Sequence, residues 1–447
     1  MKKLSARELL AVASMLFGMF FGAGNLIFPA SMGQQAGRAV WLAGAGLLIT
    51  GVGLPLLGVA ALGVSRANGL LELSSRVGRR YGLFFTCLLY LTIGPFFAIP
   101  RCATVSYTVG VQQLLPGADP RSALALFSLL FFGAVLFFSL RPGELLTWIG
   151  KVLNPLFLCF LAVLVVRALT APLGEVFAAA PVGAYAVNAF GTGFLEGYNT
   201  MDALAGLAFG IVVVDAIRRL GVTEPAEIAR STVGAGVFSA LLMALIYLLV
   251  AVMAAQSRGL FEPAANGGEA LAQIARHYFG GAGALLLALT VTVACLKTAV
   301  GLVTSCGETF VQMFPRGPGY PVWAVGFCAF SFVIANFGLN AIIAWAAPVL
   351  MFLYPLAIVL ILLTLCGGLF GHSRRVLGWT VGCTVPAAVL DLICALPKGS
   401  AAARLLAPVA GLARWLPLAD SGFGWVLPAL AGLAVGLVLT RRAGARG

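Results

Sequence analysis

Long apolar runs, separated by short polar connections, dominate the chain. Residues 231–255, 340–371 and 421–440 each match or exceed the length of about 18 apolar residues that crosses the hydrocarbon core of a bilayer. Because no water is available there, every spanning segment must be a helix or a strand of a closed barrel. The runs lack the alternating pattern of barrel strands, so they predict membrane-spanning α-helices.

The hydrophobic pattern predicts twelve spans and one all-α transmembrane domain that covers residues 1–447. Their approximate bounds are 8–32, 39–64, 82–112, 122–140, 148–166, 187–216, 231–256, 280–311, 320–335, 340–369, 375–396 and 421–440. The longest connections, 65–81, 257–279 and 397–420, are too short to form a soluble domain. The functional machinery must therefore lie within the membrane.

Composition and charge agree with this picture. Hydrophobic residues make up 61% of the chain and charged residues only 10%, whereas a soluble domain carries roughly 25% charged residues. The net charge of +13 would suggest nucleic-acid binding in a soluble protein, but most Lys and Arg residues gather in the connections on one side. The positive-inside rule then predicts a multi-pass protein of the cell (inner or plasma) membrane, with both termini in the cytoplasm and no nucleic-acid partner.

Two predicted spans contain interruptions. The first span includes Gly22-Ala23-Gly24-Asn25 near its middle, followed by Pro29. The sixth includes the sequence G-T-G-F-L-E-G-Y-N-T-M-D over residues 191–202. Glycine and asparagine destabilise a helix interior, so backbone groups become free at both places.

Broken helices at matching places in two halves indicate an inverted-repeat transporter. Free amides at a half-helix N-terminus favour an anion, and free carbonyls at a C-terminus favour a cation. An amino-acid zwitterion carries both charges. The alternative is that the glycines only permit tight helix packing.

At these residues the sequence resembles the branched-chain amino acid:cation symporter family, within the amino acid-polyamine-organocation superfamily. The resemblance covers essentially the whole chain and rests on residues 20–29, 94–107, 193–202 and 294–302. It implies a LeuT-like fold with inverted repeats at 8–166 and 187–369, discontinuous first and sixth helices, and two additional helices within 375–440. It also implies symport of leucine, isoleucine and valine with Na⁺ or H⁺, without another cofactor.

The resemblance also implies a set of site residues. The substrate would be bound by Gly22, Ala23, Gly24, Asn25, Thr104, Tyr107, Gly193, Phe194, Glu196 and Gly197. A sodium ion would be bound by Gly18, Phe21, Ala294 and Thr298. Lys297 departs from the pattern of related sodium-coupled carriers, which favour an uncharged residue there.

A lysine near mid-membrane costs roughly 2.5–3.5 kcal/mol unless it faces a cavity or a partner. One hypothesis is that the ammonium of Lys297 replaces a coupling sodium, with Glu196 as its partner across the cavity. Another is that desolvation lets Lys297 release its proton, which would give proton coupling. The third interpretation is that its side chain only extends to an interface.

Two further charged residues lie within spans. Arg101 follows Pro100 in the third span, and we expect it to satisfy carbonyls freed by Pro95 and Pro100, as structural support. Asp202 follows the second interruption, where it would act as a gate residue or cap the half-helix N-terminus.

Other function classes fit the sequence less well. The two histidines, His277 and His372, lie in predicted connections on opposite sides, so no acid-base or metal cluster of a membrane enzyme is visible. There is no Walker loop, and no filter repeat or charged ring typical of a channel. A carrier remains, and a sodium-independent exchanger or proton symporter is the alternative to a sodium symporter. The preference among leucine, isoleucine and valine stays open, because an apolar pocket distinguishes one methylene by only about 1–3 kcal/mol.

Overall fold

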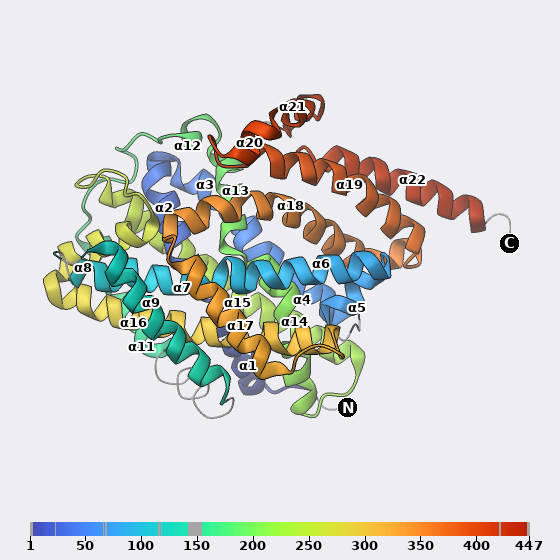
Figure 1. Ribbon diagram of the computed structural model, residues 1–447, viewed down its shortest axis with the longest axis horizontal. Helices are drawn as coiled ribbons and strands as arrows, with labels where there is room; N and C mark the ends of the chain where they lie inside the picture. The colour runs from blue at the N-terminus through green and yellow to red at the C-terminus, as the bar shows by residue number, and fades with distance from the viewer. Residues whose placement is uncertain are drawn as a thin grey trace.

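The computed structural model describes residues 3–444 except 23, 66, 68, 115, 116, 118, 142–153, 420 and 421. Within these ranges every regular element is a helix (Figure 1). The first half contains α1 (Ala6–Phe20), α2 (Gly24–Ala36), η1 (Gly37–Ala39), α3 (Val40–Leu48), η2 (Ile49–Gly53), α4 (Leu54–Ser65), α5 (Leu70–Ser75), α6 (Arg79–Leu91), η3 (Thr92–Phe96), α7 (Ala98–Ser106), η4 (Tyr107–Val111), α8 (Gln112–Leu114), α9 (Pro120–Ser139) and α11 (Asn154–Thr170).

The second half begins with a short helix and continues with the longest helices of the chain. It contains α12 (Ala184–Val187), α13 (Ala189–Thr200), α14 (Asp202–Arg219), α15 (Pro225–Ser257), α16 (Gly267–Met313), α17 (Tyr320–Ala335), α18 (Leu339–Leu365), η6 (Gly367–Phe370), α19 (Arg374–Cys394), α20 (Ala401–Leu405), α21 (Ala407–Ala410), η7 (Gly411–Trp415) and α22 (Val426–Gly444).

The described helices have the length and apolar character of a multi-pass membrane protein. Seven helical stretches in this part of the chain can cross a bilayer, or eight when α13 and α14 count as one span bent by 43°. Two shorter apolar helices, Leu158–Thr170 and Tyr320–Ala335, fall on the predicted fifth and ninth spans. The all-helical membrane fold is thus confirmed, while the number twelve stays a prediction.

One predicted connection is largely helical. Residues 267–279 continue into α16 and meet its membrane-crossing part at a kink at Gly280, where φ is 58° and ψ is −148°. Asn266 caps this helix, because its side chain accepts a hydrogen bond from the amide of Glu269. The spacing of Asn266 and Glu269 is a helix-start signal that we overlooked in a polar segment.

The third span is less regular than expected. Between α6 and α7 the π-helical turn η3 contains Gly94, which has non-helical angles of φ −98° and ψ −124°. Pro95 follows directly, and a proline cannot donate the hydrogen bond that would continue the helix. π-Helical turns inside helices are frequent at functional sites.

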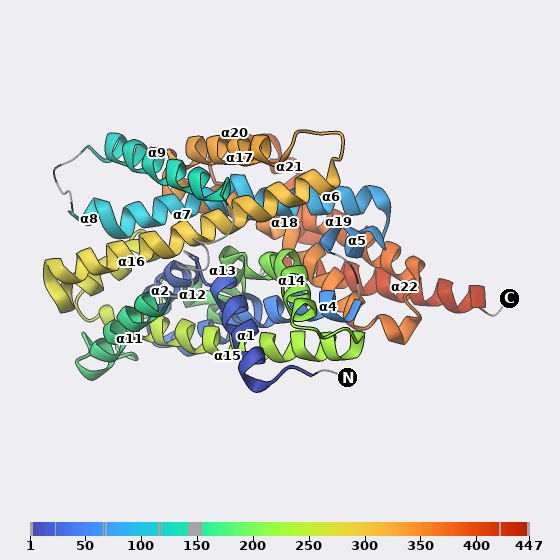
Figure 2. The same ribbon diagram turned by 90° about the horizontal axis from the view of Figure 1, so that it is seen from below.

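The helices form two layers (Figure 2). The first, here called the broken-helix layer, consists of α1–α4 and α13–α15, in which α13 packs on α3, α14 on α4, and α15 on α1 and α2. The second, the scaffold layer, consists of α6, α7, α9, α16 and α17. Contacts of α16 with α2 join the layers, and α19 packs along α22 at the periphery.

Close approach of α13 to α3 explains two glycines of the sixth span. A Cβ atom on Gly197 would lie 3.0 Å from the carbonyl oxygen of Leu47 and from the amide of Gly51, and one on Gly193 would overlap the carbonyl of Ala43. Helix packing in membranes uses small residues in this way. These two glycines therefore permit tight helix packing, and their predicted contact with the substrate stays a prediction.

Connections that were predicted to share a side of the membrane lie together. The start of α19 meets the end of α22, where the hydroxyls of Ser373 and Thr440 are 2.9 Å apart. At the opposite end, the amide of Arg38 donates to the carbonyl of Ala179 at 2.9 Å. Figure 1 shows α5 and the C-terminus at one end, with α8 and α12 at the other.

Candidate functional site

The first helix breaks where the sequence predicted. Helix α1 ends at Phe20, Phe21 has extended angles of φ −72° and ψ 100°, and α2 begins at Gly24. The side-chain oxygen of Asn25 accepts a hydrogen bond of 2.7 Å from the amide of Gly22, which satisfies one freed donor. Ala23, also predicted here, lies outside the described residues.

The second break is narrower than predicted. Residues 191–200 remain helical, and the chain leaves the helix only at Met201, whose φ of 64° and ψ of 10° are left-handed. Such a conformation is strained for a residue other than glycine, and strained residues cluster at functional sites. The break frees the carbonyls of Asn199 and Thr200 at the end of α13.

A buried hydrogen-bond cluster joins the two breaks. The side-chain amide of Asn25 donates to Asp202 Oδ2 at 2.8 Å, and the hydroxyl of Tyr247 on α15 donates to the same oxygen at 2.6 Å. The Asn25 amide also contacts the Tyr247 hydroxyl. All three side chains are buried, so this Asn25–Asp202–Tyr247 cluster fixes both broken helices to α15.

The cluster corrects one prediction and adds a residue. Asp202 does not cap α14, because its carboxylate binds Asn25 and Tyr247 while the cap position belongs to Met201. Tyr247 was not predicted as a site residue, because it is one polar group within a long apolar run. No local motif identifies it; only the approach of α15 to both breaks does so.

Arg101 also binds the second break. It is 5% exposed, and it donates from Nη1 to the carbonyl of Asn199 at 2.5 Å and from Nη2 to that of Thr200 at 3.3 Å. The expectation that Pro95 and Pro100 supply its acceptors is wrong, because the carbonyls freed at Met201 lie within its reach. Its guanidinium stacks 5.1 Å from the ring centre of Phe28.

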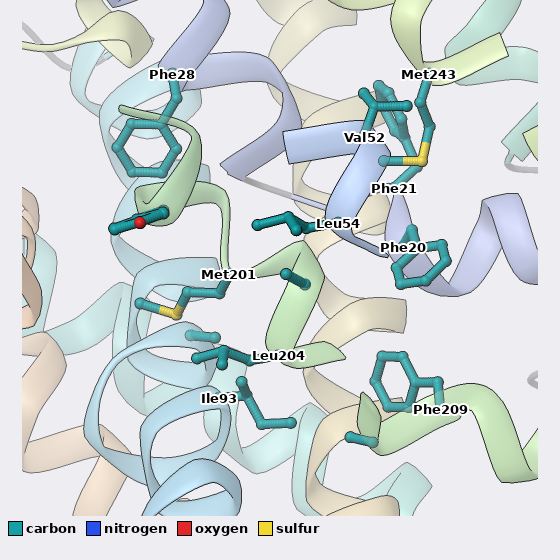
Figure 3. Packing of buried hydrophobic residues seen from close by; sticks show 14 of the residues in the cluster. Phe20, Phe21, Phe28, Val52, Leu54, Ile93, Met201, Leu204, Phe209 and Met243 are labelled. Carbon is teal, nitrogen blue, oxygen red and sulfur yellow. The ribbon is translucent and has the colours of Figure 1, made fainter. Parts of the chain in front are cut away.

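Between the breaks lies a small cavity, here called the central cavity, of about 40 Å³. It has room for only a few waters, each of which needs roughly 10–15 Å³, so in this conformation it is too small for an amino acid. Phe20, Ile93 and Met201, which line it, are among the buried apolar side chains in Figure 3. Its lining consists of Met19, Phe20, Gly22, Gly24, Asn25, Ile93, Ala98, Arg101, Cys102, Thr200, Met201, Asp202, Ala205, Phe209, Thr298 and Leu302.

A larger space of about 280 Å³, the outer cavity, lies next to the central one. Glu196 lies here and accepts a hydrogen bond of 3.2 Å from the side chain of Asn199. Because Phe28 and Asn199 line the outer cavity and Arg101 binds both, these three residues separate the two cavities. The lining is Ile27, Phe28, Ser31, Gln35, Glu196, Asn199, Ala265, Asn266, Gly267, Asn340, Ile343 and Ala344.

Several residues expected in the substrate site point elsewhere. Thr104 donates to the carbonyls of Pro100 and Arg101 within its own helix. The hydroxyl of Tyr107 donates to Pro120 at 3.1 Å, and the ring of Phe194 packs 4.9 Å from that of Phe423. These contacts keep all three away from the central cavity in the observed conformation.

The eighth predicted span touches the first break, as the expected sodium site requires. A Cβ atom on Gly22 would lie 3.0 Å from Cγ2 of Thr298, whose hydroxyl donates to Ala294 at 3.1 Å. Lys297 makes no ion pair with Glu196 in the described part of the chain, because Glu196 belongs to the outer cavity. The sodium site with Gly18 and Phe21 stays a prediction.

The tight fit at Gly24 gives a first testable prediction. A Cβ atom there would lie 2.8 Å from Nη2 of Arg101. We therefore expect Gly24→Ala to displace the guanidinium and to lower solute uptake about tenfold or more. The overpacking itself costs about 1–3 kcal/mol of folding stability. Uptake by the reconstituted variant measures this. Gly301→Ala on α16 is the matched control, because a Cβ atom there meets open space. Equal uptake by both variants would refute the tight fit.

Comparison with known proteins agrees with this geometry. A family model described as "Branched-chain amino acid transport protein" matches residues 5–443. The branched-chain amino acid permease BrnQ of Lactobacillus delbrueckii subsp. lactis is 53% identical over 96% of this chain and 95% of its own. The branched-chain amino acid transport system 2 carrier protein of Pseudomonas aeruginosa is 41% identical, over 99% and 98% of the two chains.

Solved structures show the same fold. Mhp1, a nucleobase-cation-symport-1 family transporter, matches with a TM-score of 0.61 at 15% identity, over 98% of this chain and 92% of its own. MhsT, solved in complex with L-phenylalanine, matches with a TM-score of 0.58 at 15% identity, over 98% of each chain. The LeuT-like fold with discontinuous first and sixth helices is thus confirmed, and the chain belongs to the branched-chain amino acid transport protein family.

Proposed function

We propose that the protein is a secondary transporter that carries leucine, isoleucine and valine across the cell membrane by alternating access. The main supporting observation is that two helix breaks face one cavity and are joined through Asn25 and Asp202. Freed backbone groups at such breaks suit both charges of an amino-acid zwitterion. The printed names of the relatives describe branched-chain amino acid permeases and carriers, which favours this substrate class.

The apolar lining suits the side chains of these amino acids. Phe20, Ile93 and Phe209 give part of the central cavity an apolar wall, and an aliphatic side chain that packs on these three residues meets carbon atoms. Binding then gains about 25 cal/mol for each Å² of apolar surface that leaves water. A charged side chain would lose its hydration without finding a partner among these three residues.

Alternating access requires the central cavity to open to each side in turn. In the observed conformation it is too small for an amino acid, and Phe28, Arg101 and Asn199 separate it from the outer cavity. Rocking of the broken-helix layer against the scaffold layer around this site would open either path. By the positive-inside rule, the outer cavity faces the cell exterior and both termini lie in the cytoplasm.

Two coupling schemes are compatible with the site. In the first, a sodium ion binds at Gly18, Phe21, Ala294 and Thr298, where the first break approaches α16. In the second, Lys297 replaces that ion, and the protein is a proton symporter or a sodium-independent exchanger. The proximity of Thr298 to Gly22 favours the first scheme, because a hydroxyl there can bind the ion together with carbonyls freed at the break.

Uptake of radiolabelled leucine into proteoliposomes tests the proposal, with sodium and proton gradients imposed separately. We expect accumulation under the sodium gradient in the wild type. Accumulation without sodium that is lost or becomes sodium-dependent in Lys297→Ala would favour the second scheme. Lys398→Ala, on an exposed connection, is the control. Absence of leucine uptake under every gradient would overturn the substrate assignment.

A further inference from the structure

Arg101 is a buried cation that makes no direct salt bridge to a carboxylate of the described residues. Only 5% of its surface is exposed. The carboxylate of Asp202 lines the same cavity, but its hydrogen bonds go to Asn25 and Tyr247. Burying an unpaired charge is costly, and residues that carry one within a membrane are functional candidates.

Hydrogen bonding of the guanidinium is also incomplete. Nη1 and Nη2 donate to the carbonyls of Asn199 and Thr200, but the buried Nε has no hydrogen-bond partner among the described residues. Buried donors are almost always satisfied, so an orphaned one requires an explanation. The bond from Nη2 to Thr200 is the longer of the two, at 3.3 Å. Nε and Nη2 therefore form the edge of the guanidinium that is open to a further acceptor.

This edge has the geometry of a carboxylate site. Nε–H and Nη2–H of an arginine point in parallel and bind the two oxygens of a carboxylate together. The ring of Phe28 stacks on the guanidinium and holds its plane. Gly24 lets the backbone of α2 approach Nη2 closely, because any Cβ atom there would lie 2.8 Å from it. Both contacts come from α2, directly after the first break.

We propose that Arg101 binds the carboxylate of the transported amino acid through Nε and Nη2. Nη2 then leaves Thr200, whose carbonyl becomes an acceptor for the ammonium of the same substrate. Without substrate, Arg101 thus donates to both carbonyls of the second break. When the substrate binds, Arg101 replaces the bond to the Thr200 carbonyl with a bond to the substrate carboxylate. The inference rests on the proposed function and extends it by naming the group that binds the carboxylate.

Competition for radiolabelled leucine on the purified full-length protein tests the inference. The competitors are L-leucine and L-leucinamide, which keeps the ammonium and the side chain but has no carboxylate. In the wild type we expect leucine to compete at least about 100-fold better than leucinamide, because a site built to bind a polar group rejects an analogue that lacks it. In Arg101→Gln we expect this ratio to fall to roughly tenfold or less, and Arg101→Lys to keep an intermediate ratio.

The ratio separates a binding role from a structural one. If Arg101→Gln weakens leucine and leucinamide equally, the residue only supports the fold and the inference is wrong. If that variant is not recovered folded, the wild-type ratio and the Arg101→Lys ratio still decide, and equal competition by both compounds overturns the inference. If the wild type binds neither compound, the proposed function itself fails.

Discussion

Asp202→Ala should reduce leucine uptake by at least about tenfold. The substitution removes the acceptor shared by the Asn25 amide and the Tyr247 hydroxyl, both of which are buried. Each buried donor left without a partner costs about 1–3 kcal/mol, and every 1.4 kcal/mol corresponds to about a factor of ten. The lost contacts hold the two helix breaks together, so the substitution disturbs the arrangement of the site itself. Uptake per folded protein in proteoliposomes measures the effect.

Asp215→Ala is the matched control for this prediction. Asp215 lies on the same helix, half-exposed, and its ion pair with Arg218 at 3.2 Å is near the surface. Such pairs contribute only about 0–1 kcal/mol, so we expect uptake close to that of the wild type. Size-exclusion chromatography establishes that both variants are folded. If the two substitutions lower uptake equally, the Asn25–Asp202–Tyr247 cluster has no special role.

Much of the fold could be predicted because lipid imposes strict conditions on a spanning chain. The length of an apolar run and the need to satisfy the backbone leave helices as the solution, and α17 begins and ends at Tyr320 and Ala335 as expected. The helix at residues 267–279 was missed because it covers the protein instead of crossing lipid. Its apolar stripe, which includes Leu271 and Ile274, is buried against neighbouring helices.

The two breaks show how far composition can locate a site. Gly22, Gly24 and Asn25 mark the first break correctly, since glycine and asparagine favour non-helical backbone. In the sixth span Gly193 and Gly197 allow close packing against α3, and the break occurs at Met201, which has no intrinsic preference for a left-handed conformation. Tertiary contacts determine such a position, so propensity alone cannot identify it.

For the charged residues, the sequence identifies unusual positions but not which of them lie together. The sequence marked Arg101, Asp202, Glu196 and Lys297 as unusual because charge is rare within spans. Which of them meet depends on how helices distant in sequence pack together. Arg101 and Asp202 line the central cavity, whereas Glu196 belongs to the outer one. The lysine therefore lacks the partner that similar depth in the membrane suggested.

The central claim is that the amino acid binds in the central cavity, and filling that cavity should abolish binding. Ala205 lines it from α14, one turn after Met201. A phenylalanine at this position adds a phenyl ring to a space that is only about 40 Å³ in the observed conformation. The aromatic ring would occupy the place of the aliphatic substrate side chain. Val212→Phe is the control, because Val212 lies on the same helix and is 40% exposed.

Saturation binding of radiolabelled L-leucine to the purified wild type, Ala205→Phe and Val212→Phe is the most direct test. Thermal unfolding of each protein establishes that the variants are folded, since overpacking costs typically about 1–3 kcal/mol. The account predicts saturable binding by the wild type and Val212→Phe, and loss of binding by a folded Ala205→Phe. Binding by Ala205→Phe with wild-type affinity would contradict it and would mean that leucine binds elsewhere.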